Sequence, residues 1–212
     1  MLVTVLGLAC LATAEPAPTS FAYVLQADSL AKTKPAVVER LVACGRDWVV
    51  LDKVFGGDTP WEHAGLDAIR RGQQGRKVIA YISIGEAEDY RPYWRKDWVK
   101  AIAARARLKN PAALVIPQNG SPLLAHADFL QTISGIGIED LFTNGNKLQP
   151  KLHTSEVLGH LKQMTGAKKP VLLIEYPKTA ERQTLVKKLA NENGCVWLLT
   201  DRQLKTLGES GT

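Results

Sequence analysis

The 212-residue sequence has few of the side chains that build metal centres and disulfide scaffolds, with three cysteines and four histidines. No cysteines stand in a CxxC spacing and no histidines in an HxxxH spacing, so no metal site and no cofactor are expected. A GxSxG nucleophile elbow and a Walker phosphate loop are also missing. No apolar run is long enough to span a membrane as a permanent helix.

The positive charge of the chain lacks the pattern of a nucleic-acid-binding surface. The formal net charge is +6, and basic pairs such as Arg70-Arg71, Lys168-Lys169 and Lys187-Lys188 are dispersed over presumed helices. Aromatic residues do not interleave with them, as a stacking platform for bases requires. A nucleic-acid partner is therefore not expected, and the pairs fit a solvated helical surface attracted to anionic envelopes.

The first fourteen residues differ from the rest of the chain. Residues 1–14, "MLVTVLGLACLATA", are apolar, uncharged and end in Ala12-Thr13-Ala14, which suits a signal peptidase. They predict a signal peptide without a basic n-region, and therefore a secreted or periplasmic protein. The remaining residues, 15–212, are expected to form one domain. A disordered or strand-like N-terminus is the alternative. Cys44 and Cys195 would remain after cleavage, either as one disulfide or as two separate buried thiols.

Short apolar runs alternate with helical patterns along the whole chain. Several runs are continuously apolar, as expected when helices cover both faces of a parallel sheet. A doubly wound sheet is disfavoured because no phosphate loop follows the first strand, and Asp140 occupies the third-glycine position of "GIGIED". The pattern predicts an α/β fold, a TIM-type (β/α) barrel with seven strands, one fewer than usual. The predicted strands are 21–26, 47–52, 77–84, 112–117, 135–142, 170–176 and 195–200.

Helix signals lie between these strands. Thr59, Pro60 and Glu62 form a capping-box pattern that predicts a helix start. The segment "TAERQTLVKKLANENG" predicts a helix that Asn193-Gly194 ends. A single amphipathic helix is expected over residues 92 to 109.

Polar residues follow five consecutive predicted strands at the same end. They are Asp52, Glu86, Asn119, the pair Glu139 and Asp140, and Glu175. In a (β/α) barrel these ends converge on the face where active sites are built. Crowded carboxylates can divide into a general acid and an ionised partner, as glycoside hydrolysis requires. Any single acid could instead cap a helix or pair with a lysine.

Aromatic side chains near the same strand ends fit this prediction. Sugar rings stack on aromatic faces, and the candidates are Tyr81, Tyr90, Tyr93, Trp94 and Tyr176. Among the acids, Glu88 and Asp89 have a simpler explanation as first-turn acids of the following helix.

Four stretches resemble the endo-α-1,4-polygalactosaminidase family of glycoside hydrolases, family 114: "KVIAYISIGEAEDYRPYW", "VIPQNGSPLL", "GIGIEDLF" and "VLLIEYP". The resemblance runs in order over most of residues 21 to 205. It implies a secreted TIM-type barrel that cleaves α-1,4-linked galactosamine polymers of exopolysaccharide or cell-surface matrix. By position, Glu139 resembles one of the two catalytic carboxylates of the family. Asp52, Glu86, Asn119 and Glu175 resemble its pocket residues.

One part of the family pattern is missing. The second catalytic group of the family is an aspartate that ends the fourth strand, whereas this sequence passes from "DYRPYWRKDWVK" directly into "AIAARARLKNPAALVIPQNG". Three interpretations stay open. Asp52 or Glu86 replaces the aspartate in an active hydrolase; the chain is a carbohydrate-binding relative without turnover; or it is a deletion product. An open barrel edge before residues 112–117 would then favour an oligomer.

Overall fold

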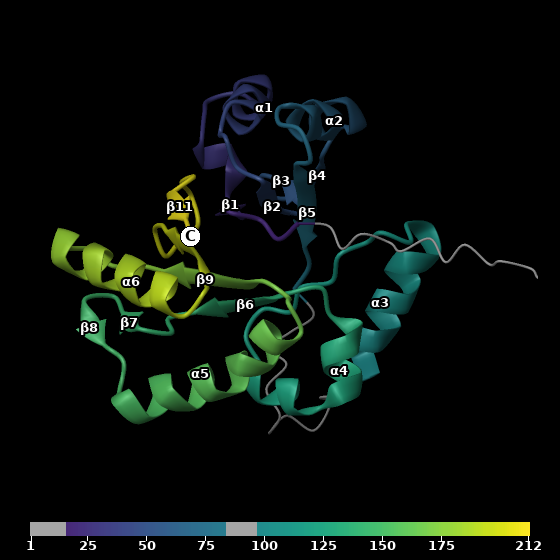
Figure 1. Cartoon of the computed structure of the whole chain (residues 1–212). Helices are drawn as coiled ribbons and strands as arrows, with labels where there is room; N and C mark the ends of the chain where they lie inside the picture. Colours follow the sequence, from purple (N-terminus) through teal and green to yellow (C-terminus); the bar gives the residue numbers. More distant parts are fainter. Residues whose placement is uncertain (1–15, 84–96) are drawn as a thin grey trace, which may run out of the picture.

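The computed structural model describes residues 16–83 and 97–212. Within them the chain is a mixed α/β protein whose helices lie outside two sheets (Figure 1). The predicted signal peptide, Glu86 and the aromatic residues at 90, 93 and 94 lie outside the described residues.

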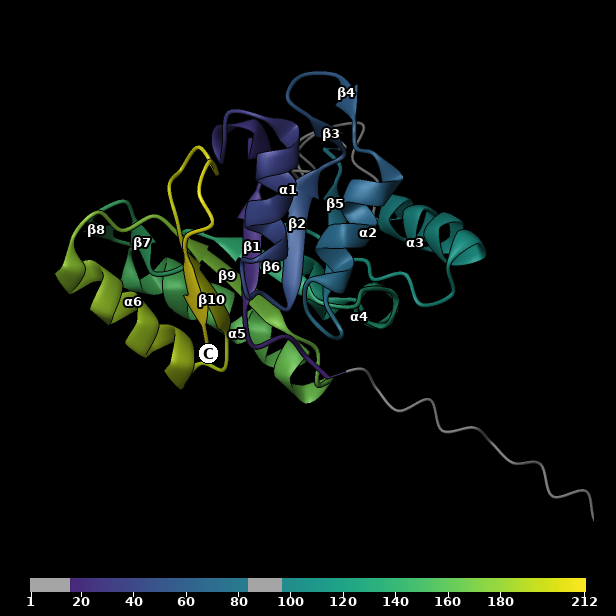
Figure 2. The same cartoon turned by 90° about the horizontal axis from the view of Figure 1, so that it is seen from above.

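The first sheet has three parallel strands in the order β1-β2-β5. They span Phe21–Val24, Trp48–Asp52 and Lys77–Tyr81. Helices α1 (Lys34–Val42) and α2 (His63–Arg71) cover its outer face, as Figure 2 shows from above. Their buried side chains pack on the outward residues of β1 and β2, and this cluster includes Val37, Leu41, Ile69, Ala22, Val24, Val49 and Leu51.

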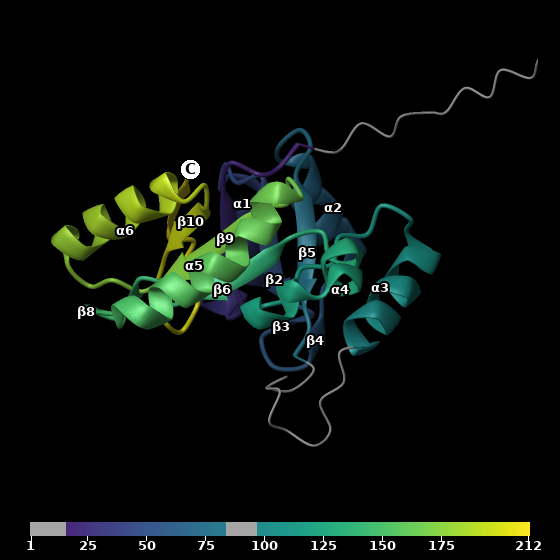
Figure 3. The ribbon, with the colours of Figure 1, turned by 60° about the horizontal axis from the view of Figure 1, so that its bottom comes forward.

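The second sheet has the order β11-β10-β9-β6. Strands β6 (Ile136–Glu139), β9 (Val171–Glu175) and β10 (Val196–Leu199) are parallel, and β11 (Glu209–Gly211) pairs antiparallel with β10. The outer side carries η2 and three α-helices, visible in Figure 3. Their bounds are Ser121–Ala125 for η2, Ala127–Thr132 for α4, Lys151–Gly166 for α5 and Ala180–Glu192 for α6.

The inner faces of the two sheets share one apolar interior. Because successive side chains of a strand point to opposite faces, every second residue of β1, β2, β9 and β10 enters this interior. Its buried members are Phe21, Tyr23, Trp48, Val50, Leu172, Ile174, Tyr176, Val196, Leu198 and Leu204. The arrangement therefore resembles two facing parts of a barrel wall, each backed by helices.

The described residues do not form a closed barrel. At one junction, β1 meets the C-terminal segment through Phe21 N, which donates to Ser210 Oγ at 2.9 Å, and Leu25 N, which donates to Leu204 O at 3.1 Å. At the other, β5 pairs with β2 and with no other described strand.

The prediction of a regular strand over residues 112–117 is wrong. This segment runs beside β6 with a single bridge, Gln118 to Gly137, while Ser134 N and Gly137 N donate to Val115 O and Pro117 O. Pro117 has no N–H to donate to a ladder, which limits regular pairing. The other six predicted strands are confirmed, with shorter bounds.

The predicted helix start at Thr59 is also wrong. Thr59–Pro60 forms β4, which pairs with β3 (Val54–Phe55), and the helix begins only at His63. Trp61 explains the difference, because its Nε1 donates to Asp52 O at 3.0 Å and its ring packs on Phe55. The helix predicted in "TAERQTLVKKLANENG" is confirmed as α6, which Thr179 caps by accepting from Arg182 N and which ends at Asn193.

Several remaining features complete the fold. Helix α3 (Asp97–Lys109) falls within the predicted helix 92 to 109, and η1 (Ala27–Ser29) follows β1. No helix in the described part of the chain has the length and apolarity needed to cross a membrane. Cys44 and Cys195 are free thiols in separate apolar clusters, which settles the alternative left open by their number.

Arg76 joins the ends of α1 and α2 from a buried position. Its side chain is only 3% exposed, and Nη1 donates to Leu41 O, Val42 O and Ile69 O at 3.0, 3.0 and 2.9 Å. Nε donates to Arg46 O at 2.8 Å. One guanidinium thus donates to carbonyls at the C-terminal ends of both helices, where the regular hydrogen bonding of a helix runs out.

Replacing Arg76 should destabilise the protein strongly. We expect Arg76→Met to lower the free energy of unfolding by about 2–4 kcal/mol, because several carbonyls lose a buried charged donor. Urea denaturation measures the change. The exposed Arg71→Met removes the same charge from the same region as a control, and an equal loss there would contradict the assigned role.

Candidate functional site

Five side chains at the C-terminal rim of the strands share the inward-facing parity. They are Tyr23 on β1, Asp52 at the end of β2, Tyr81 at the end of β5, Glu139 at the end of β6, and Tyr176 directly after β9. Tyr23, Asp52, Tyr81 and Tyr176 each face the interior by the two-residue alternation of their own strand. Glu139 pairs in register with Ile174 of β9, which faces the interior. The rim thus brings two acids and three tyrosines together from both sheets.

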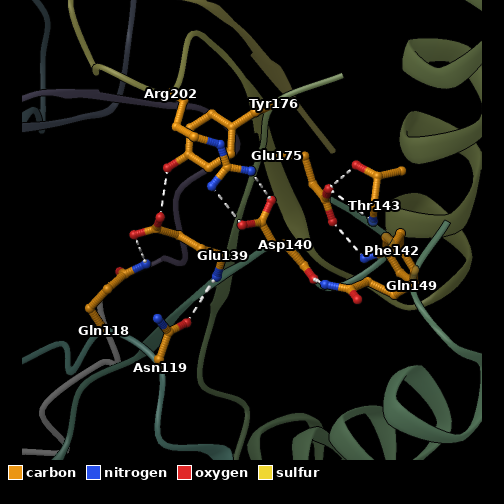
Figure 4. A network of polar contacts seen from close by, with 10 residues as sticks. All are labelled: Gln118, Asn119, Glu139, Asp140, Phe142, Thr143, Gln149, Glu175, Tyr176 and Arg202. Carbon is orange, nitrogen blue, oxygen red and sulfur yellow. Dashed lines mark hydrogen bonds and ion pairs between the residues drawn. The ribbon is translucent and has the colours of Figure 1, made fainter. Parts of the chain in front are cut away.

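Glu139 is held by two side-chain donors on its two oxygens. Gln118 Nε2 donates to Oε1 at 2.9 Å, and the Tyr176 hydroxyl donates to Oε2 at 2.7 Å (Figure 4). Its backbone N–H donates to Asn119 Oδ1 at 3.0 Å. Asn119 therefore supports the backbone of Glu139, while the carboxylate is oriented by Gln118 and Tyr176.

Gly137 provides the space that Gln118 needs to reach Glu139. A Cβ at position 137 would lie 2.0 Å from Gln118 Oε1 and 3.0 Å from its Cδ. Gly137 and Gln118 are bridge partners on neighbouring segments, so the amide of Gln118 lies across the glycine. Any other residue at 137 would displace this amide.

Tyr176 is fixed from two sides. Its hydroxyl bonds Glu139, and the Arg202 guanidinium lies 4.4 Å from its ring centroid. Burial, followed by the hydrogen bond to Glu139, raises the pKa of Tyr176 well above its ordinary value, so the phenol stays protonated and donates. With 4% of its surface exposed and Arg202 over its ring, Tyr176 is better placed to position Glu139 than to stack on a sugar.

Asp140 holds Arg202 in that place. Two hydrogen bonds of 2.9 and 2.8 Å join Arg202 Nη1 and Nη2 to the two carboxylate oxygens of Asp140. Asp140 has a φ of 53° in the left-handed region, which aspartate tolerates better than most residues. This turn directs Asp140 toward Arg202 while Glu139 points to the interior.

Tyr23 connects the two sheets electrostatically. Burial raises the pKa of its phenol well above the ordinary value, and the charges of Tyr81, Glu139 and Asp52 raise it further. The Tyr23 and Tyr81 rings meet edge to face with centroids 6.0 Å apart. Asp52 and Glu139 therefore both act on the same phenol from opposite sheets.

Asp52 also borders a small cleft of about 250 Å³ that includes Asp28 and Gly56. Its Oδ1 accepts from Val54 N at 3.1 Å, which holds the turn after β2.

Glu175 faces the other way. It is fully buried on the helix side of β9, and accepts from Phe142 N at 2.6 Å, from Thr143 N at 3.2 Å and from Thr143 Oγ1 at 2.5 Å. In Figure 4 its carboxylate and that of Glu139 lie on opposite sides of Asp140. Glu175 thus fixes the loop after Glu139. The sequence predicted Glu175 as a pocket residue, and this prediction is wrong because its side chain is buried on the helix side of the sheet.

A larger cleft of about 1050 Å³ opens beside Tyr176. The hairpin of β7 (Thr143–Asn144) and β8 (Lys147–Leu148) forms one wall, and residues 176–178 and 200–202 form the other. This hairpin, Gln118, Arg202 and Tyr23 were not predicted from the sequence. The inward parity of Phe21 and Tyr23 would have identified Tyr23, whereas nothing local indicated Arg202. Among residues 16–83 and 97–212 no cluster of potential ligands could hold a metal ion.

Comparisons with known proteins identify the fold. No family model matches the sequence. The chain is 23% identical to an uncharacterized protein of Deinococcus radiodurans, covering 75% of this chain and 74% of that protein. It is also 23% identical to an uncharacterized protein of Methanocaldococcus jannaschii, covering 68% and 66%.

Among solved structures, the glycoside hydrolase domain of PelA from Pseudomonas aeruginosa matches with a TM-score of 0.61 and 16% identity, covering 91% of this chain and 98% of that domain. A Glu→Ala variant of that domain matches with the same TM-score of 0.61 and 14% identity. The chain has the fold of a glycoside hydrolase domain. At these identities the similarity concerns the fold, and the matched share shows that it extends over nearly the whole of both chains.

The buried Glu175 should make stability depend on pH. Burial raises its pKa from 4.5 to about 7, although the three donors oppose this. Between these values the folded protein binds a proton that the unfolded chain lacks, so stability falls as pH rises from 4.5 to 7 and then levels off. The loss should reach about 2–3 kcal/mol relative to Glu175→Gln.

Urea denaturation of both proteins at pH 4.5 to 8 measures this difference. Parallel curves for the two proteins would show that Glu175 does not titrate in this range.

Proposed function

We propose that the protein is a secreted glycoside hydrolase of the polygalactosaminidase type, which cleaves α-1,4-linked galactosamine-containing polysaccharide within the chain. Glu139 is its essential carboxylate. The position of Glu139 supports this most. Its carboxylate lies at the inward rim of a fold shared with a glycoside hydrolase domain, and Gln118 and Tyr176 hold it in place. The larger cleft opens next to it, beside Tyr176.

Glu139 suits the part of nucleophile or base. Both of its oxygens accept hydrogen bonds, whereas a general acid must donate one to the leaving oxygen. We assign that proton to Asp52, the inward-facing carboxyl group of the sheet opposite Glu139, because both carboxyl groups act on the same Tyr23 phenol. Bond cleavage then moves this proton to the leaving sugar, while water supplies the hydroxyl of the new reducing end. A carboxyl separation of ~5 Å would retain and one of ~6.5–9.5 Å would invert the anomeric configuration.

We interpret residues 15–212 as one (β/α) barrel domain that lacks a β/α unit between β5 and residues 112–118, and residues 1–14 as its signal peptide. The single bridge at Gln118 and the one-sided pairing of β5 support the lost unit.

A carbohydrate-binding relative without turnover is the second candidate. It is favoured by the same opening, since no described strand next to β5 supplies the family's second aspartate. The rim and the cleft would then bind polysaccharide without cleaving it.

Glu139→Gln should abolish hydrolysis. The amide keeps the size of the side chain but cannot act as nucleophile or base, so product release from partially deacetylated α-1,4-galactosaminan should fall by at least about 10²-fold. Mass spectrometry of the oligosaccharide products measures it, and the thermal midpoint should change little.

The exposed Glu156→Gln is the matched control and should keep full activity. Unchanged hydrolysis by Glu139→Gln would overturn the assignment. A chain that folds but never releases products would favour the binding protein.

Gly137→Ala should reduce turnover through Gln118. The new Cβ displaces the Gln118 amide and removes one of the two hydrogen bonds on Glu139. A lost hydrogen bond to a charged group is worth about 1.5–3 kcal/mol, which predicts about a tenfold or greater fall in kcat with little change in KM.

The double variant Gly137→Ala/Gln118→Ala relieves the clash and should recover stability but not kcat. If kcat recovers together with the thermal midpoint, the hydrogen bond from Gln118 has no part in turnover. Gly159→Ala on α5, where a Cβ meets nothing, serves as the control.

A further inference from the structure

The larger cleft beside Tyr176 has a basic character that the rim does not share. Its charged lining residues are Lys147, Lys178, Asp201 and Arg202, and the rest of the lining is mostly amide, glycine and hydroxyl groups. The acids of the rim, Asp52 and Glu139, do not line it. The site therefore consists of an acidic part and a basic part next to each other.

Two of the four charges in the cleft are already engaged. Arg202 is paired with Asp140 through both of its terminal nitrogens. Asp201 accepts from the backbone N–H groups of Gln203, Lys205 and Thr206 at 3.0–3.2 Å and from Thr206 Oγ1 at 2.9 Å. This carboxylate closes its own turn and is poorly placed to attract a cation.

Lys147 and Lys178 remain, one on each wall of the cleft. Both side chains are exposed, and neither forms an ion pair with any residue that the structure describes. The walls are tied together, because Lys178 N donates to Asn146 Oδ1 at 2.8 Å and Arg182 Nε donates to Asn146 O at 3.1 Å. The two ammonium groups are thus attached to a braced loop pair.

We propose that this cleft is a subsite for the carboxylate of an acidic sugar, so that the substrate is a polysaccharide with uronic acid units. The inference rests on the proposed action on polysaccharide. With Arg202 paired to Asp140, Lys147 and Lys178 outnumber Asp201, so the net positive charge of the cleft attracts a carboxylate and repels the free amine of a deacetylated hexosamine. The amides of Asn144 and Asn146 suit the ring hydroxyls.

The basic cleft lies next to the acidic rim, and Tyr176 connects the subsite to Glu139. Tyr176 lines the cleft and donates to Glu139, so a sugar in the cleft lies next to the acidic rim. An amino sugar at the rim and an acidic sugar in the cleft would satisfy both parts. The substrate class is therefore a polymer in which the two kinds of sugar alternate or adjoin.

Calorimetric titration of the Glu139→Gln chain, which cannot consume the ligand, tests the subsite. The probes are α-1,4-linked oligogalacturonate, N-acetylated α-1,4-oligogalactosamine and the same oligomer after deacetylation. We expect oligogalacturonate to bind about tenfold or more tightly than the deacetylated oligomer at low salt, and salt to weaken this binding.

Adding Lys147→Gln and Lys178→Gln should weaken oligogalacturonate binding about tenfold or more and leave the N-acetylated oligomer unaffected. Lys32→Gln with Lys162→Gln removes the same net charge as the matched control, because both lysines are exposed and neither lines the cleft. Equal losses in the two pairs, or tighter binding of the deacetylated oligomer, would overturn the proposal.

The result separates this inference from the proposed hydrolysis. If oligogalacturonate binding depends on the two lysines but the unsubstituted chain cleaves none of the polymers, the subsite stands and the hydrolase is rejected. If the unsubstituted chain cleaves polysaccharide and needs Glu139 to do so, but binding does not depend on the lysines, the hydrolase stands and the subsite is rejected.

Discussion

The two-residue alternation of parallel strands around a shared interior is the constraint on which the rest of this structure depends. It sends Leu172, Ile174 and Tyr176 into the space between the sheets and Leu173 and Glu175 toward the helices. The adjacent residues Glu175 and Tyr176 therefore point to opposite faces of the sheet and have different roles. Tyr176 reaches Glu139 at the rim, while Glu175 holds the loop that follows Glu139.

The same interior has to be enclosed without a continuous ring of strands. Around β1 the enclosure uses hydrogen bonds to Ser210 and Leu204 in place of a ladder. Beside β6 it uses residues 112–118, which are extended but pair regularly at only one bridge. Leu114 and Ile116 still pack on the interior from this segment, so side-chain parity persists where the ladder does not. Gln118 has the same parity, which explains how it reaches Glu139.

Most of the fold followed from local patterns, since continuous apolar runs and the helix stop at Asn193-Gly194 depend on neighbours in sequence. The errors occurred where a distant partner decides. Trp61 bonds Asp52 O and keeps Thr59–Pro60 in a hairpin, against a good capping box. Pro117 limits pairing beside β6. At the site, the acids at strand ends were predictable as a group, but period-2 parity was needed to separate Glu139 from Glu175. Arg202 was not predictable, because its partner Asp140 is 62 residues away.

The pair of Asp140 and Arg202 explains how acidic and basic parts can adjoin without cancelling each other. Arg202 covers Tyr176 and neutralises Asp140, so the two charged groups next to Glu139 form a paired, nearly neutral unit at the edge of the cleft. Without it, the ammonium groups and the rim carboxylates would attract one another across the opening, and a ligand would have to break those contacts. Because each charge at the boundary has an internal partner, Glu139 and the lysines stay available for groups on a bound polymer.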